Sequence, residues 1–217
     1  MDRFSFCMGN KAYDKKEDNG GLLKADAPDI DHLKSMDLRS QVTKRICKEE
    51  VKHLASMAES SFDDREFSEF FQLLYDEDAR VSENIAWIMS HFNKVGWGRL
   101  DSKKQSLMEE AMHTSSTTEL RLLLTIISKL PVSEEEITIP FIDFCLDNIA
   151  NMAQSVAVKS LCIYLSFQQC KFFPELLHEL EMILTSYDGV PLSPGLKSAR
   201  SKVLQAIAKY NNRHKSQ

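Results

Sequence analysis

Apolar side chains recur at helical spacing through the middle and the end of the chain. Val81 is followed four and seven residues later by Ile85 and Ile88, so the three side chains share one helix face. Similar apolar faces begin at three later positions, Leu120, Val156 and Leu196. The four starting positions are 39, 36 and 40 residues apart. We therefore predict four equivalent helices, over about 78–93, 117–130, 153–168 and 194–211.

A second set of helices is predicted to precede them, over about 65–75, 99–113, 134–150 and 171–184. Residues that start helices mark several boundaries. Ser133 and Glu136 have the spacing of a capping box, and Thr117 and Thr118 are candidate N-caps. Pro140, inside a predicted helix, should kink that helix or delay its start. The pattern predicts an all-α fold of about four helix pairs.

The region before the first pair divides into two parts. An apolar stripe at helical spacing runs from Leu38 to Ala58 and predicts one amphipathic helix that caps the first pair. Residues 1–35 are charged and rich in turn-forming residues, so we expect a flexible or loosely docked segment. Residues 36–217 are then a single helical domain.

A helix pair that recurs about every 40 residues is typical of HEAT and armadillo repeats. Asp78 followed by Val81 resembles the start of a HEAT second helix, although Ser82 stands where that family usually has arginine. Over roughly Asp64 to Tyr210 the chain thus resembles the HEAT-like and armadillo-like α-solenoids. The resemblance implies a right-handed α-α superhelix whose second helices line a concave face.

Composition adds no chemistry to this architecture. The sequence contains no phosphate-binding glycine loop, no H-E-x-x-H and no C-x-x-C, and its six histidines are scattered. We therefore expect no catalytic residue, no metal site and no cofactor. The five cysteines are expected to be small buried side chains in a reducing compartment. Without a signal peptide or a membrane-spanning run, we expect a soluble cytoplasmic protein.

Charge is distributed unevenly between the two sets of helices. The predicted first helices carry thirteen acidic and five basic residues, whereas the second helices carry three acidic and eight basic residues. A basic second-helix side would suit an acidic protein surface or a nucleic-acid backbone. The alternative is that bases in the last helix simply complement the helix dipole. The candidate partner-binding bases are Arg80, Arg121, Lys159, Lys197 and Arg200.

Trp97 is a further candidate. It stands between Gly96 and Gly98, which predicts a loop. A tryptophan in such a loop either folds back over the core or contacts a partner.

These features predict a non-catalytic protein–protein interaction or scaffold module that binds an unknown, acidic protein surface on its concave face. Stacked helix pairs offer an extended surface for such binding. The alternative is a HEAT-like DNA-binding or DNA alkylation repair protein, which would need a strongly basic groove. The net charge of −5 argues against nucleic acid as the partner.

Overall fold

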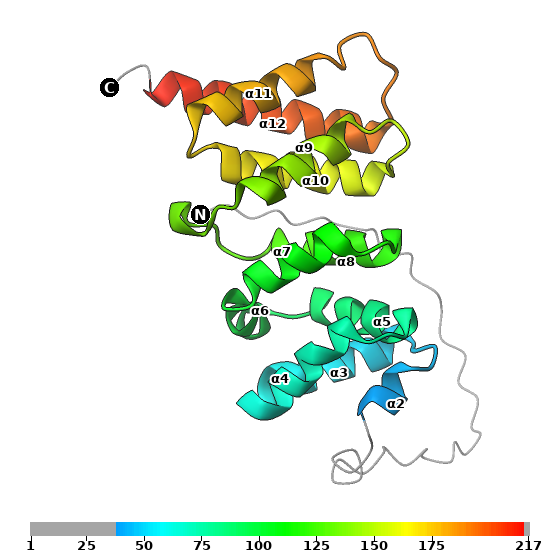
Figure 1. Ribbon diagram of the computed structural model, residues 1–217. Coiled ribbons are helices and arrows are strands. Elements are labelled where there is room, and N and C mark those ends of the chain that lie inside the picture. Colours follow the sequence, from blue (N-terminus) through cyan, green and yellow to red (C-terminus); the bar gives the residue numbers. More distant parts are fainter. Residues whose placement is uncertain (1–37, 215–217) are drawn as a thin grey trace, which may run out of the picture. The chain divides into compact units, whose positions relative to one another are not determined.

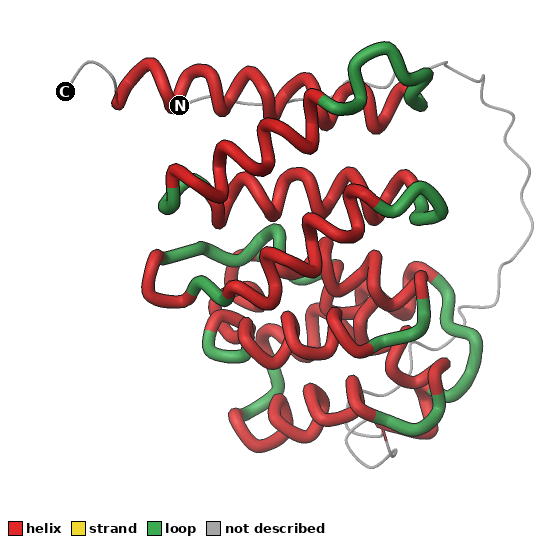
Figure 2. The backbone as a smooth tube through the Cα atoms, turned by 45° about the horizontal axis from the view of Figure 1, so that its top comes forward, coloured by secondary structure: helices red, strands yellow, loops and turns green. Residues whose placement is uncertain are grey.

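The computed structural model describes residues 38–214, which belong to one unit, Asp37–Gln217 (Figure 1). Every regular element in this range is helical, and it contains no β-strand (Figure 2). The prediction of an all-α fold is confirmed. The segment predicted to be flexible or loosely docked, residues 1–35, lies outside the described residues.

Four helix pairs follow one another along the chain, as predicted. In each pair, one or two shorter elements precede a second helix. The first helices are α4 (Asp64–Gln72) with η1 (Leu73–Tyr75), α6 (Lys94–Asp101) with α7 (Lys104–His113), α9 (Ile139–Ala150) after η2 (Glu134–Glu136), and α11 (Pro174–Thr185). The second helices are α5 (Ala79–Ser90), α8 (Thr117–Ile127), α10 (Val156–Cys170) and α12 (Pro194–His214).

The second helices all start in the same way. Each is preceded by a short polar residue whose side-chain oxygen accepts a hydrogen bond from a backbone N–H two or three residues later, which satisfies a free donor of the first turn. These residues are Asp78, Ser116, Ser155 and Ser193. They recur every 38 or 39 residues, a more regular period than the apolar pattern indicated. The prediction of Thr117 or Thr118 as the cap of α8 was wrong, because Ser116 caps it.

One of the four apolar starting positions was also wrong. Val156 is 44% exposed, whereas Val158 is fully buried. The reason lies in the position of the cap. In α5, α10 and α12 the residue that enters the core is the third after the capping side chain, and after Ser155 that residue is Val158. The apolar residues before it belong to the exposed first turn.

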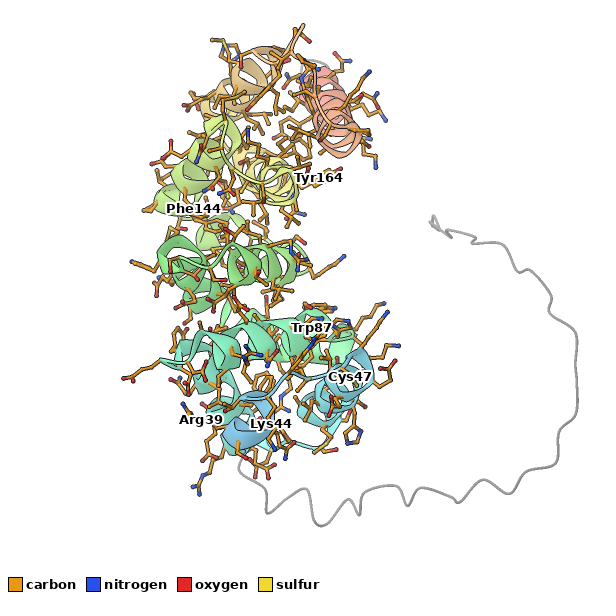
Figure 3. All side chains as sticks on the ribbon, turned by 90° about the vertical axis from the view of Figure 1, so that its right-hand side faces the viewer. Arg39, Lys44, Cys47, Trp87, Phe144 and Tyr164 are labelled. Atoms are coloured by element: carbon orange, nitrogen blue, oxygen red, sulfur yellow. The ribbon has the colours of Figure 1, made fainter. Side chains whose placement is uncertain are left out.

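Two rows of helices result from the stacking of these pairs. α3 (Lys48–Ser60), α5, α8, α10 and α12 contact one another in succession, and α7, α9 and α11 do the same. In Figure 3, Trp87 of α5 and Tyr164 of α10 lie on one side, and Phe144 of α9 lies on the other. The apolar core fills the space between the rows. We call the outer side of α3, α5, α8, α10 and α12 the second-helix face.

The predicted single cap helix is in fact two helices, α2 (Leu38–Val42) and α3. The chain between them is held open by Asn84 of α5. Its Nδ2 donates to the carbonyl oxygens of Val42 at 2.7 Å and Lys44 at 3.0 Å. α3 then restarts at Cys47, whose backbone N–H donates to the Glu50 carboxylate at 2.6 Å. A side chain more than 30 residues away therefore breaks a stripe that is continuous in the sequence.

The loop predicted around Trp97 is helical, because Gly96, Trp97 and Gly98 all belong to α6. Asn93 caps this helix. The buried carboxylate of Glu59 in α3 accepts hydrogen bonds from both the backbone N–H and the side-chain amide of Asn93. Trp97 is half-buried, with its ring 6.3 Å from that of Phe92 in an edge-to-face arrangement. Of the two alternatives for Trp97, the packed one describes its position.

Pro140 delays the start of its helix, which is one of the two outcomes predicted for it. α9 begins at Ile139, so the proline lies in the first turn, where its missing N–H leaves no bond unmade. The capping box of Ser133 and Glu136 is present, but it opens the short helix η2. The Glu136 carboxylate also receives the ammonium of Lys104 at 2.8 Å, which ties η2 to α7.

This ion pair predicts a pH-dependent contribution to stability. Hydrogen bonds from Lys104 and Ser133 lower the pKa of Glu136 from 4.5 to about 2. A lowered pKa in the folded state stabilises the fold above about pH 4.5, and this contribution is lost as the pH falls towards 2. Because the carboxylate side chain is 43% exposed, solvent screening limits the contribution to about 1 kcal/mol.

Glu136→Gln is expected to lower the free energy of unfolding at neutral pH and to match the unmodified protein near pH 2. Urea denaturation across this pH range measures the difference. Glu135→Gln is the matched control, since Glu135 makes no ion pair with residues 38–214. A difference that is constant with pH would contradict the assignment.

Candidate interaction groove

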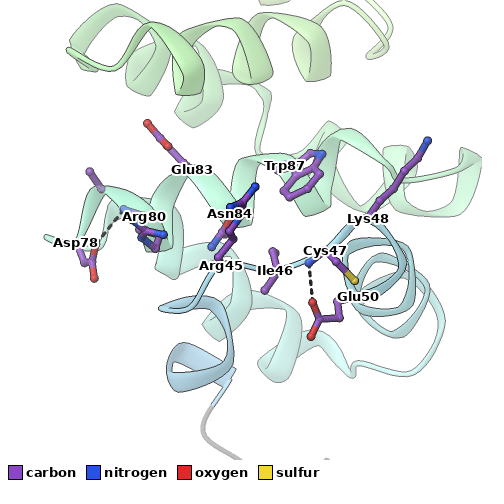
Figure 4. A pocket seen from close by; sticks show the side chains of 11 residues that line it. Arg45, Ile46, Cys47, Lys48, Glu50, Asp78, Arg80, Glu83, Asn84 and Trp87 are labelled. Atoms are coloured by element: carbon purple, nitrogen blue, oxygen red, sulfur yellow. Dashed lines mark hydrogen bonds between the residues drawn. The ribbon is translucent and has the colours of Figure 1, made fainter. Parts of the chain in front are cut away.

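A groove of about 960 Å³ opens at the α3 end of the second-helix face (Figure 4). One wall is the chain that leaves α2 and enters α3, and the other is the start of α5. We call it the cap groove. Its lining residues are Arg45, Ile46, Cys47, Lys48, Glu50, Asp78, Ala79, Arg80, Glu83, Asn84 and Trp87. Few of these are apolar, so the groove differs from the mostly apolar pockets that bind small molecules.

The acidic residues of the cap groove already accept hydrogen bonds from the protein itself. Asp78 accepts from the backbone N–H of Arg80 at 2.9 Å, and Glu83 accepts from the Ser116 hydroxyl at 2.5 Å. Glu50 accepts from the Cys47 N–H, and this bond lowers the pKa of the Glu50 carboxyl. Each of the three carboxylates thus uses part of its acceptor capacity within the protein.

The basic side chains of the cap groove, unlike the acidic ones, make no such bonds within the described part of the protein. Arg45, Lys48 and Arg80 are exposed, and their side chains make no ion pair or hydrogen bond with residues 38–214. α3 and α5 both begin at the groove, so the positive ends of two helix dipoles add to the bases. The groove therefore offers free donors, while each of its three carboxylates already accepts at least one hydrogen bond from the protein.

Trp87 supplies the apolar surface of the cap groove. It lies on α5, half-buried, with one part packed against the core and its ring edge-to-face with His91 at 6.1 Å. The neighbouring Asn84 holds the facing chain through its bonds to Val42 and Lys44. Both walls are therefore fixed without a ligand, which lowers the entropy lost on binding.

The candidate bases predicted from sequence fall into two groups. Arg80 lines the cap groove, Arg121 is exposed on α8, and Lys197 is exposed on α12. Arg121 and Lys197 are therefore exposed bases of second helices outside the cap groove, and Lys197 lies beside the loop between α11 and α12.

Lys159 and Arg200 serve the fold itself. Lys159 is only 4% exposed, with its ammonium 5.8 Å from the ring centre of Tyr187, and burial lowers the pKa of its amine. Arg200 donates to the Leu184 carbonyl and the Asp188 carboxylate, each at 2.5 Å, which fastens the loop between α11 and α12. Neither charge is free on the second-helix face, and Trp97 lies outside the cap groove.

Sequence reasoning did not identify Arg45, Lys48 or Trp87 as site residues. The first two were placed on a continuous helix. The proximity of Arg45 to Trp87 depends on the break between α2 and α3, which has no local marker in the sequence. A turn signal such as proline or glycine is absent from residues 43–47.

No cluster of three or more metal-ligating side chains occurs among residues 38–214. Cys145, Cys162 and Cys170 are buried as predicted, whereas Cys47 is exposed and corrects that prediction. Burial raises the pKa of the Cys145 thiol and raises that of Cys170 to about 12, which is the reverse of an activated nucleophile.

The stack of helix pairs defines an α-solenoid, a class whose extended faces commonly bind other proteins. The family model of the HEAT repeat domain matches residues 38–207. The chain therefore belongs to the HEAT-repeat family, which is generally non-enzymatic and typical of protein-interaction and scaffold modules. No curated protein and no solved structure matches the chain. None of the helices in residues 38–214 is long and apolar enough to span a membrane.

Proposed function

We propose that this protein is a non-catalytic interaction module that binds an acidic surface of a partner protein on its second-helix face. The observation that carries the proposal is the unbroken row of α3, α5, α8, α10 and α12, which presents exposed bases on or directly before α3 and on α5, α8 and α12. These bases are Arg45, Lys48, Arg80, Arg121 and Lys197. A row of this kind offers a large surface without any rearrangement of the fold.

The first helices support the same orientation by their opposite charge. Exposed acidic side chains such as Glu109, Asp143 and Glu179 lie on α7, α9 and α11. An acidic partner is repelled by that side and attracted to the other, so electrostatics contributes to the choice of face. We propose a cytoplasmic location, where the exposed Cys47 stays reduced.

Nucleic acid is a less suitable ligand for this face. Two of the predicted bases, Lys159 and Arg200, are engaged within the fold, which leaves fewer charges to follow a phosphate backbone. Three carboxylates also line the cap groove. A DNA alkylation repair activity would require a more strongly basic groove than these residues make.

Arg121→Glu tests the proposal directly. Arg121 lies on α8, outside the cap groove, and is exposed, so its reversal should leave the fold intact. We expect about a fivefold weaker affinity for the partner, because reversing one exposed charge changes the binding free energy by roughly 1 kcal/mol. The partner is isolated by tagged capture from nuclease-treated lysate, then purified and titrated against both proteins.

Arg65→Glu is the matched control for this measurement. Arg65 is an exposed base on α4, a first helix, where the same charge change should leave the affinity unaltered. Equal affinities for Arg121→Glu and the unmodified protein would place the partner on another surface. If a partner is captured only from lysate without nuclease treatment, the ligand is nucleic acid and the proposal of a protein ligand is wrong.

A further inference from the structure

We infer that the cap groove is the subsite for an acidic peptide segment of the partner, with one apolar side chain of that segment seated on Trp87. The inference rests on the proposed function and assigns it a place and a ligand chemistry. Three features of the groove lead to it: its free donors, its partly exposed indole and its fixed walls.

The hydrogen-bonding state of the groove selects for carboxylates. Formal charges in the lining balance, since Arg45, Lys48 and Arg80 face Glu50, Asp78 and Glu83. Net charge therefore does not determine the ligand. The acids accept bonds from the protein, while the bases have no partner among residues 38–214. A ligand completes this arrangement by bringing acceptors, and a carboxylate pairs with a guanidinium through two parallel bonds.

Trp87 adds a requirement for apolar contact. Bases alone would bind any anion weakly, because exposed ion pairs contribute little. In Figure 4 the indole of Trp87 lies between Arg45 and Lys48, with Arg80 beyond Arg45. A segment that pairs with Arg45 therefore brings its neighbouring side chains over the ring. Tryptophan and arginine are the residue types most enriched in the energetically dominant parts of interfaces. The ligand is thus acidic with an apolar side chain among its carboxylates.

The rigidity of the groove makes a short segment sufficient. Asn84 fixes the chain from Val42 to Lys44, and the core holds Trp87, so both walls are in place before binding. A peptide that enters loses its own conformational freedom but requires no ordering of the protein. The groove volume of about 960 Å³ accommodates several side chains. The remaining partner surface can then reach Arg121 on the next second helix.

The test uses the full chain and a fluorescein-labelled peptide of alternating glutamate and aspartate with one central leucine. Its matched control replaces every carboxylate by the corresponding amide. Binding is measured by fluorescence anisotropy at low and at physiological ionic strength. We expect the acidic peptide to bind, the amide peptide to bind at least tenfold more weakly, and added salt to weaken the acidic one. Equal binding of the two peptides would overturn the inference.

Protein variants locate the bound peptide. Arg45→Glu and Arg80→Glu are each expected to weaken peptide binding five- to tenfold. Lys202→Glu is the control, since it makes the same charge change at an exposed position of α12 outside the groove. All three positions are exposed, so the variants should fold, and thermal unfolding verifies this. If Lys202→Glu weakens binding as much as the other two, the attraction is non-specific and the inference is wrong.

Trp87 itself reports occupancy. The chain has two tryptophans, so Trp97→Phe leaves Trp87 as the sole tryptophan, which is excited selectively at wavelengths that tyrosine does not absorb. Its emission should shift when the acidic peptide binds, and anisotropy that rises without such a shift would place the peptide elsewhere.

The inference and the proposed function fail in different ways. If the partner's affinity falls with Arg121→Glu but not with Arg45→Glu or Arg80→Glu, the proposed function stands and the assignment of the cap groove is wrong. If Arg45→Glu and Arg80→Glu weaken the acidic peptide while Arg121→Glu leaves the partner's affinity unchanged, the groove assignment stands. In that case the partner does not use the rest of the second-helix face.

Discussion

Arg99→Ala is expected to lower the free energy of unfolding by about 3 kcal/mol. Arg99 of α6 donates to the carbonyl oxygens of Ala58 at 2.9 Å, Phe62 at 2.8 Å and Asp63 at 3.0 Å. Its guanidinium also lies 4.0 Å from the ring centre of Phe67. One side chain thus donates to three carbonyls where α3 ends and α4 begins. The Asp63 oxygen also accepts the backbone N–H of Phe67, so the main loss on substitution by alanine is the donor to the Ala58 and Phe62 oxygens.

Chemical denaturation of the purified variants measures this loss. Arg99→Lys should restore only part of the stability, because an ammonium cannot reproduce the planar fork of donors. Arg65→Ala is the control, since Arg65 is an exposed arginine whose ion pair with Glu69 lies on the surface, where such pairs contribute little to stability. Similar losses for Arg99→Ala and Arg65→Ala would show that the carbonyl contacts contribute little.

Two glycines of the same helix are expected to respond oppositely to alanine. A Cβ at Gly96 would lie 2.5 Å from Cδ2 and from Cγ of Phe92, whereas a Cβ at Gly98 meets nothing within 4 Å. Phe92 is buried and packs against Phe67 and Phe70, so its ring has little room to move. Gly96→Ala should therefore lower the free energy of unfolding by about 2 kcal/mol, despite the better helix propensity of alanine.

Gly98→Ala should raise the free energy of unfolding by about 1 kcal/mol, because the helix gains alanine without any new contact. Thermal and chemical unfolding measure the stability of both variants, which carry the same substitution two residues apart. Combining Gly96→Ala with Phe92→Leu tests the cause. If the clash with the ring is responsible, the double variant loses less stability than the sum of the two single variants. Equal effects at the two glycines would contradict the close packing.

Both predictions concern the junction of α3, α4 and α6, away from the residues that line the cap groove. Neither Arg99 nor Gly96 lines that groove. Their substitution should change stability more than the affinity for an acidic peptide, provided that the protein is folded under the conditions of the measurement. This separation allows defects of folding and of binding to be told apart in the same assays.

The local pattern of the sequence was sufficient for the architecture. Apolar residues at helical spacing and polar capping residues act within one or two turns, so they predict an all-α chain of four pairs with a period near 40. They were least accurate where one turn decides the register. Val156 was taken as a core position because it is apolar, but the cap at Ser155 leaves the first turn exposed and makes Val158 the buried residue.

The candidate site depended on contacts between residues that are distant in sequence. Asn84 breaks the cap helix from about 40 residues away, which brings Arg45 and Lys48 to the same groove as Trp87. Stacking likewise buries Lys159. The sequence by itself determined the four helix pairs and their order, because helix formation follows local spacing. Only the tertiary structure decided which charges are free and where the groove opens, because those properties arise from the packing of one repeat against the next.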